Sequence, residues 1–130
     1  THGRIVLAAF LEKVLNDEPI TIIGDGSSMR SFMYVSDHAR GNLKALSDNA
    51  INETINLDGI KRVSVNDIVD IVKGLVAPRE VEILYVPARP GEYRGATVSR
   101  EKAKKLLDWE PTISLEEGSK MYYEWYSKQL

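Results

Sequence analysis

The sequence has 130 residues, of which 43% are hydrophobic and 28% are charged, a composition typical of a soluble globular domain with one core. The formal net charge of −2 gives no field that would attract nucleic acid or an acidic membrane surface, and no apolar run approaches the ~20 residues that cross a bilayer. The absence of cysteine excludes disulfides, a thiolate nucleophile and a cysteine metal site, and we expect a cytoplasmic protein.

The chain opens with a predicted helix followed by a short strand. Apolar side chains recur at helical spacing over residues 5–15, at Ile5, Ala8, Ala9, Leu11 and Leu15. An Asn-Asp-Glu-Pro sequence then ends the helix, and residues 20–23 predict a short buried strand. Gly24-Asp25-Gly26 breaks that strand and predicts a turn.

The next elements alternate between extended and helical segments. Residues 32–35 are predicted to be extended, and Ser36 or Asp37 to cap a helix from about 38 to 46, because a side-chain oxygen there accepts a first-turn amide. Residues 54–57 predict another short strand that ends at an Asp-Gly turn.

Three further helices and one strand are predicted in the second half. Ser64 caps a helix over residues 65–76, and residues 81–86 predict a strand. Ser99 caps a helix that ends at Leu107. The sequence Ser114-Leu115-Glu116-Glu117 is a capping box that opens a last helix to about Tyr126.

Helices alternate with short strands, so we predict the α/β fold class. The predicted strands are too short to build a large sheet. We therefore expect one small α/β domain over residues 1–130 that packs against something outside this chain. Thr1 is not methionine, and the chain runs almost directly into a helix, so we expect a fragment of a longer protein.

Two arginines are predicted on separate loops at the ends of strands. Arg30 follows the glycine turn and is either a fixed donor fork for a phosphate or carboxylate, or a surface arginine paired with an acid. Arg89 lies in a second loop, Arg89-Pro90-Gly91-Glu92, just after the predicted strand 81–86. The two arginines would clamp a diphosphate from two sides, or the second loop is simply exposed to solvent.

The spacing of residues excludes three other kinds of site. Gly24-Asp25-Gly26 begins like a dinucleotide fingerprint, but Met29 takes the place of the third glycine and no helix follows. His2 and His38 have no partners at ligand spacing, so we predict no metal site. Adjacent residues at a helix start cannot form a hydrolase triad, which excludes one at residues 36–38.

Several segments in order resemble the C-terminal half of the extended short-chain dehydrogenases, the family of NAD-dependent nucleotide-sugar epimerases and dehydratases that includes the UDP-glucose 4-epimerases. They span nearly all of the chain. The segments are Gly24-Asp25-Gly26 with Arg30, Tyr34-Val35-Ser36-Asp37, Thr54-Ile55-Asn56-Leu57, Ser64-Val65-Asn66-Asp67-Ile68, Arg89-Pro90-Gly91-Glu92, Lys102-Ala103-Lys104, Leu107-Asp108-Trp109-Glu110-Pro111 and Ser114-Leu115-Glu116-Glu117-Gly118.

The resemblance implies a substrate-binding lobe for the nucleoside diphosphate of an activated sugar, without the Rossmann core. It implies that Arg30 and Arg89 hold the diphosphate and that Glu92 faces the ribose. The backbone from Thr21 to Ile23 would meet the base, and Phe32 and Val65 would line the nucleoside pocket. Ser31 departs from the aspartate of many members, Asp108 from the usual glycine of a Leu-Gly-Trp sequence, and Ser99 from a common aspartate.

The family's glycine-rich cofactor turn and its Tyr-x-x-x-Lys pair are both absent from these 130 residues. In that chemistry the tyrosine moves a proton while NAD takes a hydride. We therefore expect NAD to be bound by an N-terminal domain of the parent enzyme, and no catalytic residue or activity in this chain alone.

The predicted partners are the sugar nucleotide, that N-terminal domain, or a second copy through an exposed apolar face. Two alternatives remain: a non-catalytic module that binds a sugar nucleotide or a protein, and an atypical reductase acting on a sugar without a nucleotide.

Overall fold

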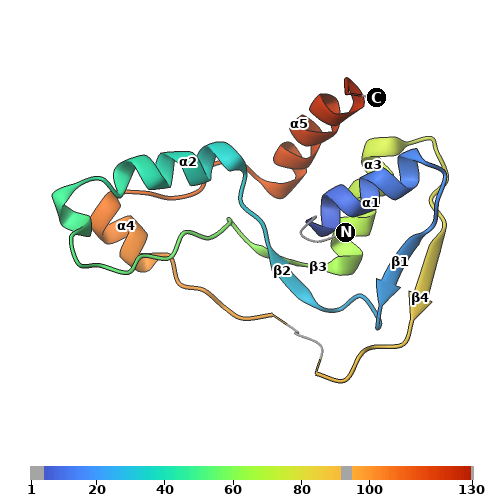
Figure 1. Cartoon of the computed structure of the whole chain (residues 1–130), viewed down its shortest axis with the longest axis horizontal. Helices are drawn as coiled ribbons and strands as arrows, with labels where there is room; N and C mark the ends of the chain where they lie inside the picture. Colours follow the sequence, from blue (N-terminus) through green and yellow to red (C-terminus); the bar gives the residue numbers. More distant parts are fainter. Residues whose placement is uncertain (1–4, 92–94, 130) are drawn as a thin grey trace. The chain divides into compact units, whose positions relative to one another are not determined.

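A computed structural model describes residues 5–91 and 95–129, and it confirms the α/β class (Figure 1). Its elements in chain order are α1 (Val6–Leu15), β1 (Ile20–Ile23), β2 (Met29–Ser31), α2 (Val35–Lys44), the 3-10 turn η1 (Asp48–Ala50), β3 (Arg62–Ser64), α3 (Val65–Val76), β4 (Ile83–Val86), α4 (Glu101–Leu107) and α5 (Leu115–Ser127).

The chain forms two compact units. Described residues of Thr1–Arg30, Val63–Gly95 and Ser119–Leu130 make the first unit, and Ser31–Arg62 with Ala96–Gly118 make the second. Strands β2 and β3 pair in a two-stranded sheet.

The first unit is built on a parallel pair of strands, β1 and β4, which lie side by side in Figure 1. Their register runs from Ile20 opposite Ile83 to Ile23 opposite Val86. Ile20 and Ile22 are fully buried, as the alternation of a strand with one covered face requires. Helices α1 and α3 contact each other, and α1 also contacts β1. The predicted strand over residues 20–23 is confirmed, and the strand predicted over 81–86 is shorter, beginning at Ile83.

Helix α1 forms where the sequence predicts it, but of the predicted apolar stripe only Leu11 is fully buried. The buried side chains are Leu7, Phe10, Leu11 and Val14, at the i, i+3, i+4, i+7 spacing of one helix face. Ile5, which begins the predicted stripe, is 63% exposed. The stripe that contains Phe10 buries more apolar area than the stripe that contains two alanines, and this decides which face turns inward.

Helix α3 begins as predicted, with Ser64 at its N-cap. The Ser64 hydroxyl accepts a hydrogen bond from the Asp67 amide at 3.1 Å, and the Asp67 carboxylate accepts from the Ser64 amide at 2.7 Å. This reciprocal capping box satisfies two donors that would otherwise have no partner in the helix. The helix buries Ile68, Val69, Val72 and Val76.

The core of the second unit surrounds Trp109. The indole is fully buried together with Ala103 and Leu107, and half-buried apolar side chains pack against them, namely Met33, Ala50, Ile55, Leu57 and Leu106. The indole Nε1 donates to the backbone carbonyl of Asp37 at 3.0 Å. Trp109 therefore ties helix α4, whose last residue is Leu107, to the first turn of α2.

The prediction that Ser36 or Asp37 caps α2 is wrong. The helix begins at Val35, and its N-cap Tyr34 makes no side-chain capping bond. Asp37 is instead 1% exposed, and its carboxylate accepts from the amides of Thr112 and Ile113 at 2.8 and 2.9 Å. It also accepts from the Thr112 hydroxyl at 2.9 Å and from Arg40 Nη2 at 2.6 Å.

The surroundings of Asp37 fix its charge state. Burial raises the pKa of the carboxyl, but the hydrogen bonds from Ile113, Arg40 and Thr112 outweigh it and lower the pKa from 3.8 to about 2. Arg40 Nη2 also donates to the carbonyl of Glu110 at 2.7 Å. Asp37 is thus the ionised centre that joins α2 to residues 110–113.

Two predicted strands differ from the structure. The extended segment predicted at 32–35 is displaced, because β2 ends at Ser31 and Val35 already begins α2. Residues 54–57 form no strand. Ser99 does accept a hydrogen bond from the Glu101 amide at 3.3 Å, although the N-cap position is Arg100. Ser114 accepts from the Glu117 amide at 3.1 Å, as expected for the hydroxyl half of its capping box.

Large apolar side chains are exposed in both units. In the first unit these are Ile5, Leu84, Tyr85, Val86, Met121 and Trp125, and in the second Val35, Leu43, Leu46, Ile51, Ile60 and Val98. In the part of the chain that the structure describes, no helix is long and apolar enough to cross a membrane. Within the same residues, no group of three or more His, Asp and Glu side chains could hold a metal ion.

Candidate functional site

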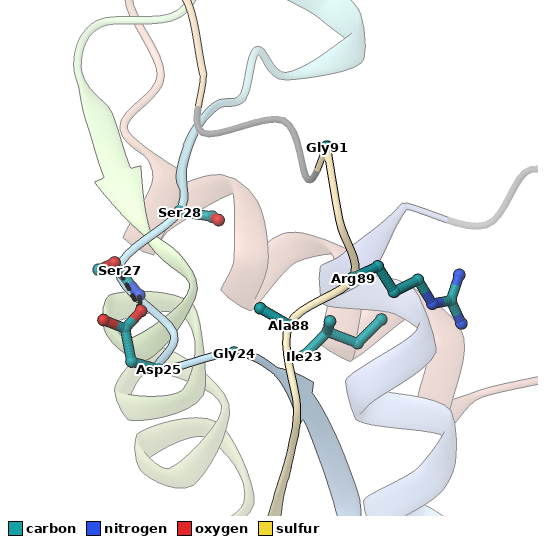
Figure 2. Close-up of a pocket in the computed structure, with 8 residues that line it drawn as sticks. All are labelled: Ile23, Gly24, Asp25, Ser27, Ser28, Ala88, Arg89 and Gly91. Atoms are coloured by element: carbon teal, nitrogen blue, oxygen red, sulfur yellow. Dashed lines mark hydrogen bonds between the residues drawn. The ribbon is translucent and has the colours of Figure 1, made fainter.

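A pocket of about 440 Å³ lies in the first unit, where β1 and β4 both end (Figure 2). Because the two strands are parallel, the loops that follow them emerge at the same edge of the sheet. One wall comes from the loop after β1 and the other from the loop after β4; the lining residues are Ile23, Gly24, Asp25, Ser27 and Ser28, and Ala88, Arg89 and Gly91. The sequence predicts Arg30 and Arg89 on loops at strand ends. The structure brings the loop after β1 and the loop that carries Arg89 together, but Arg30 itself lies within β2.

The loop after β1 is a tight turn that needs its glycines. Gly24 and Gly26 have φ values of +76° and +77°, a region that residues with a Cβ rarely adopt. The Asp25 carboxylate closes the turn by accepting from the Ser27 amide at 2.9 Å and the Ser27 hydroxyl at 2.6 Å. Figure 2 shows the carboxylate turned toward Ser27. Its negative charge is therefore held within the loop.

The loop is bound to the first turn of α3. The amide of Val65 donates to the carbonyl of Ser28, and the amide of Asn66 donates to the carbonyl of Gly26, both at 3.1 Å. The Asp67 amide donates to the Ser64 hydroxyl. The first amides of α3, which form a common anion-binding site in other proteins, are thus paired within the protein. The glycine turn leads into β2 rather than a helix, so this turn does not fit a dinucleotide.

The Asn66 side chain also binds the loop after β1. Its Nδ2 donates to the Asp25 carbonyl at 3.0 Å, and its Oδ1 accepts from the hydroxyl of Tyr85 on β4 at 3.3 Å. A Cβ added at Gly26 would lie 2.1 Å from the same Oδ1. Gly26 is therefore required both by its positive φ and by the closeness of Asn66.

The two arginines are placed differently. Arg89 lines the pocket and is exposed, and Figure 2 shows its guanidinium extending away from Asp25 and Ser27. Arg30 is half-buried at the middle of β2, is not among the lining residues, and donates from Nη1 to the Met29 carbonyl at 2.9 Å. A shared grip on one ligand by Arg30 and Arg89 stays a prediction.

The other predicted binding residues are distributed over the described chain. Ile23 lines the pocket, while Thr21 accepts from Lys13 Nζ at 3.2 Å through its hydroxyl. Val65 is half-buried in the first turn of α3. Phe32 is half-buried in the second unit, and Glu92 lies outside the described residues. Their roles toward a nucleoside stay predictions.

Sequence reasoning assigned no role to Asn66 or Tyr85. Asn66 stands in the Ser64–Ile68 segment and was noted only as part of a motif. The sequence does contain one indication of this role, because an asparagine in the first turn after a capping serine can reach a neighbouring loop with its side-chain amide. The partner of that amide could not be predicted, because Tyr85 and Asn66 approach only through the tertiary fold.

The fold and the pocket define a class: an α/β protein with a polar pocket at the carboxyl ends of paired parallel strands. The profile of the GDP-mannose 4,6 dehydratase family matches residues 3–122. The chain therefore belongs to this family, which is part of the NAD-dependent epimerases and dehydratases of the extended short-chain dehydrogenase type. This confirms the family expected from the sequence.

The relatives include epimerases, dehydratases and decarboxylases of nucleotide sugars. The chain is 35% identical over 122 residues to the UDP-glucuronate 4-epimerase of Thermodesulfobacterium geofontis, covering 93% of this chain and 37% of the relative. It resembles the crystal structure of a Thermotoga maritima UDP-glucose 4-epimerase with UDP-glucose at a TM-score of 0.88 and 36% identity, covering 98% of this chain and 41% of that one. A Bacillus cereus UDP-glucuronic acid 4-epimerase in complex with UDP-glucuronic acid and NAD gives a TM-score of 0.88 at 30% identity, covering 97% and 40%. The chain thus spans well under half the length of each of these proteins.

Proposed function

We propose that this chain is the nucleotide-sugar-binding portion of an NAD-dependent sugar-nucleotide epimerase or dehydratase, and that the pocket between the β1 and β4 loops receives the diphosphate. The observation that carries the proposal is the meeting of these two loops at one edge of a parallel strand pair, in a chain that belongs to this enzyme family. Ligands bind outside the carboxyl ends of strands in parallel α/β sheets. The pocket volume of about 440 Å³ also lies within the range of small-molecule sites.

Arg89 is the proposed first contact to the diphosphate. It is the one arginine among the described pocket-lining residues, and its exposed side chain is long enough to turn toward a ligand. Arg30 is the proposed second contact, from the strand that follows the glycine loop. A planar guanidinium presents paired donors that match phosphate oxygens, which is the reason that arginine is used in such clamps.

The remaining contacts of the proposal concern the nucleoside. Backbone at Thr21 to Ile23 would meet the base, Phe32 and Val65 would line its pocket, and Glu92 would face the ribose. Similarity to enzymes crystallised with UDP-glucose and with UDP-glucuronic acid supports a uridine nucleotide as the probe.

The test is a calorimetric titration of UDP into the full 130-residue chain and its variants Arg30→Ala and Arg89→Ala. Loss of one charged contact costs about 1.5–3 kcal/mol, so each variant should bind UDP about ten- to a hundredfold more weakly. Lys73→Ala is the matched control, because Lys73 is an exposed cation on α3 of the same unit. UDP binding that is unchanged in both arginine variants would contradict the proposed clamp.

The proposal assigns binding, and not chemistry, to this chain. NAD and the reacting groups would come from the rest of the parent enzyme, since these 130 residues hold no Tyr-x-x-x-Lys sequence. Incubation of the chain with NAD and UDP-glucose should then give no product, and measurable epimerisation or dehydration would refute this part. Large apolar side chains are exposed in both units, and contact through an apolar face with the N-terminal domain of the parent or with a second copy belongs to the same proposal.

A further inference from the structure

We infer that Asn66 is the positioning residue of the diphosphate pocket: it holds the Gly24–Ser28 loop in its binding shape and links that loop to β4 through Tyr85. The inference rests on the proposed function for the identity of the ligand, but the contacts that carry it belong to the protein alone. Neither Asn66 nor Tyr85 lines the pocket itself, so both residues act through the loop.

Three donors on two consecutive residues of α3 reach three carbonyls of the loop. The Val65 amide binds the Ser28 carbonyl, the Asn66 amide binds the Gly26 carbonyl, and Asn66 Nδ2 binds the Asp25 carbonyl, at 3.0–3.1 Å. In a trans peptide the carbonyl and the following amide point in opposite directions. The loop amides that follow these carbonyls are therefore turned away from α3.

The side chain at position 66 acts both as a donor and as an acceptor. The Asp25 carbonyl can only accept, so the amide nitrogen faces it, and the oxygen then faces the Tyr85 hydroxyl at 3.3 Å. An aspartate would lose the donor, and an apolar side chain would lose both bonds. The Asn66 amide group fits this position because it provides both functions in one rigid plane.

Tyr85 connects the second wall of the pocket to the same side chain. It precedes Val86, whose carbonyl accepts from the Gly24 amide at 2.8 Å, and the chain then continues to Ala88 and Arg89. The two pocket walls are thus joined twice, once through backbone and once through the Tyr85 and Asn66 side chains. A shift of one wall is transmitted to the other, and this fixes the distance between them.

The experiment compares the full chain with Asn66→Ala, Tyr85→Phe and the double variant, using hydrogen exchange of backbone amides by NMR and titration of UDP. Asn66→Ala should speed exchange of the Ser27 and Val65 amides several-fold and weaken UDP binding about three- to tenfold. Tyr85→Phe removes only the hydroxyl and should have the smaller effect. Asn42→Ala is the matched control, because Asn42 is exposed on α2 of the other unit.

The double variant distinguishes positioning from a general loss of stability. If the Tyr85 hydroxyl acts through Asn66, the double variant should bind UDP no more weakly than Asn66→Ala alone. Additive losses, or exchange of the Ser27 amide that is unchanged in Asn66→Ala, would overturn the inference. If the unmodified chain binds no UDP, the proposed function fails, and the exchange measurement alone then decides on Asn66.

Discussion

Replacement of Asp37 by asparagine should destabilise the second unit in a way that depends on pH. The ionised carboxylate accepts from Thr112, Ile113 and Arg40, and all of these partners are donors. An asparagine presents one oxygen and one NH2 group, so at least one donor would face another donor. The buried position, with a side chain only 2% exposed, leaves no water to relieve that contact.

The magnitude follows from the pKa. A carboxyl whose pKa falls from 3.8 to about 2 on folding contributes about 2 kcal/mol to the free energy of unfolding when it is ionised. Because the pKa is lower in the folded state, this contribution is fully present above about pH 4 and is lost as the pH falls toward 2. The difference between the original chain and Asp37→Asn should therefore be about 2 kcal/mol or more at pH 7 and shrink steadily below pH 4.

The assay is urea unfolding at pH 7, 4, 3 and 2.5, followed by Trp109 fluorescence in a Trp125→Phe background. Trp109 is buried in the same unit and bonded to the Asp37 carbonyl, whereas Trp125 is 57% exposed on α5 and would obscure the signal. Glu110→Gln is the control, because its exposed ion pair with Lys104 at 3.3 Å should contribute little. A destabilisation by Asp37→Asn that stays constant from pH 7 to pH 2.5 would refute the reasoning.

Two further predictions concern backbone positions. Asp108 ends α4 with φ +47°, in the left-handed region that favours glycine, and its side chain is fully exposed. Asp108→Gly should therefore raise the free energy of unfolding, measured by urea denaturation, by up to about 1 kcal/mol. A loss of stability would contradict this account. A Cβ at Gly59 would lie 1.8 Å from the Phe32 carbonyl oxygen, so Gly59→Ala should lower the free energy of unfolding by about 3 kcal/mol. A Cβ at Gly74 meets nothing within 4 Å, so Gly74→Ala should leave stability unchanged or raise it. Equal effects of the two substitutions would count against the close approach at Gly59.

Local sequence signals predicted the elements whose stabilising contacts are also local. Ser64 and Asp67 lie three residues apart and fix the start of α3, and the predicted bounds of that helix are confirmed. Asp37 misled the prediction, because an aspartate near a helix start is ordinarily a cap. Its actual partners at Thr112 and Ile113 are 75 and 76 residues away in the sequence. The pocket loops could be predicted individually, while the Asn66 contacts that hold them required the fold.

The segment 54–57 shows why a strand pattern alone does not make a strand. Ile55 and Leu57 are half-buried against the Trp109 cluster, while Thr54 and Asn56 are exposed, so the alternation typical of a strand is present. A strand also needs a neighbour that pairs with its backbone, and β1 has one in β4. Residues 54–57 have no such ladder within the described chain, and they remain irregular. Apolar alternation therefore predicts which side chains turn inward, and only the presence of a pairing partner converts that burial into a sheet.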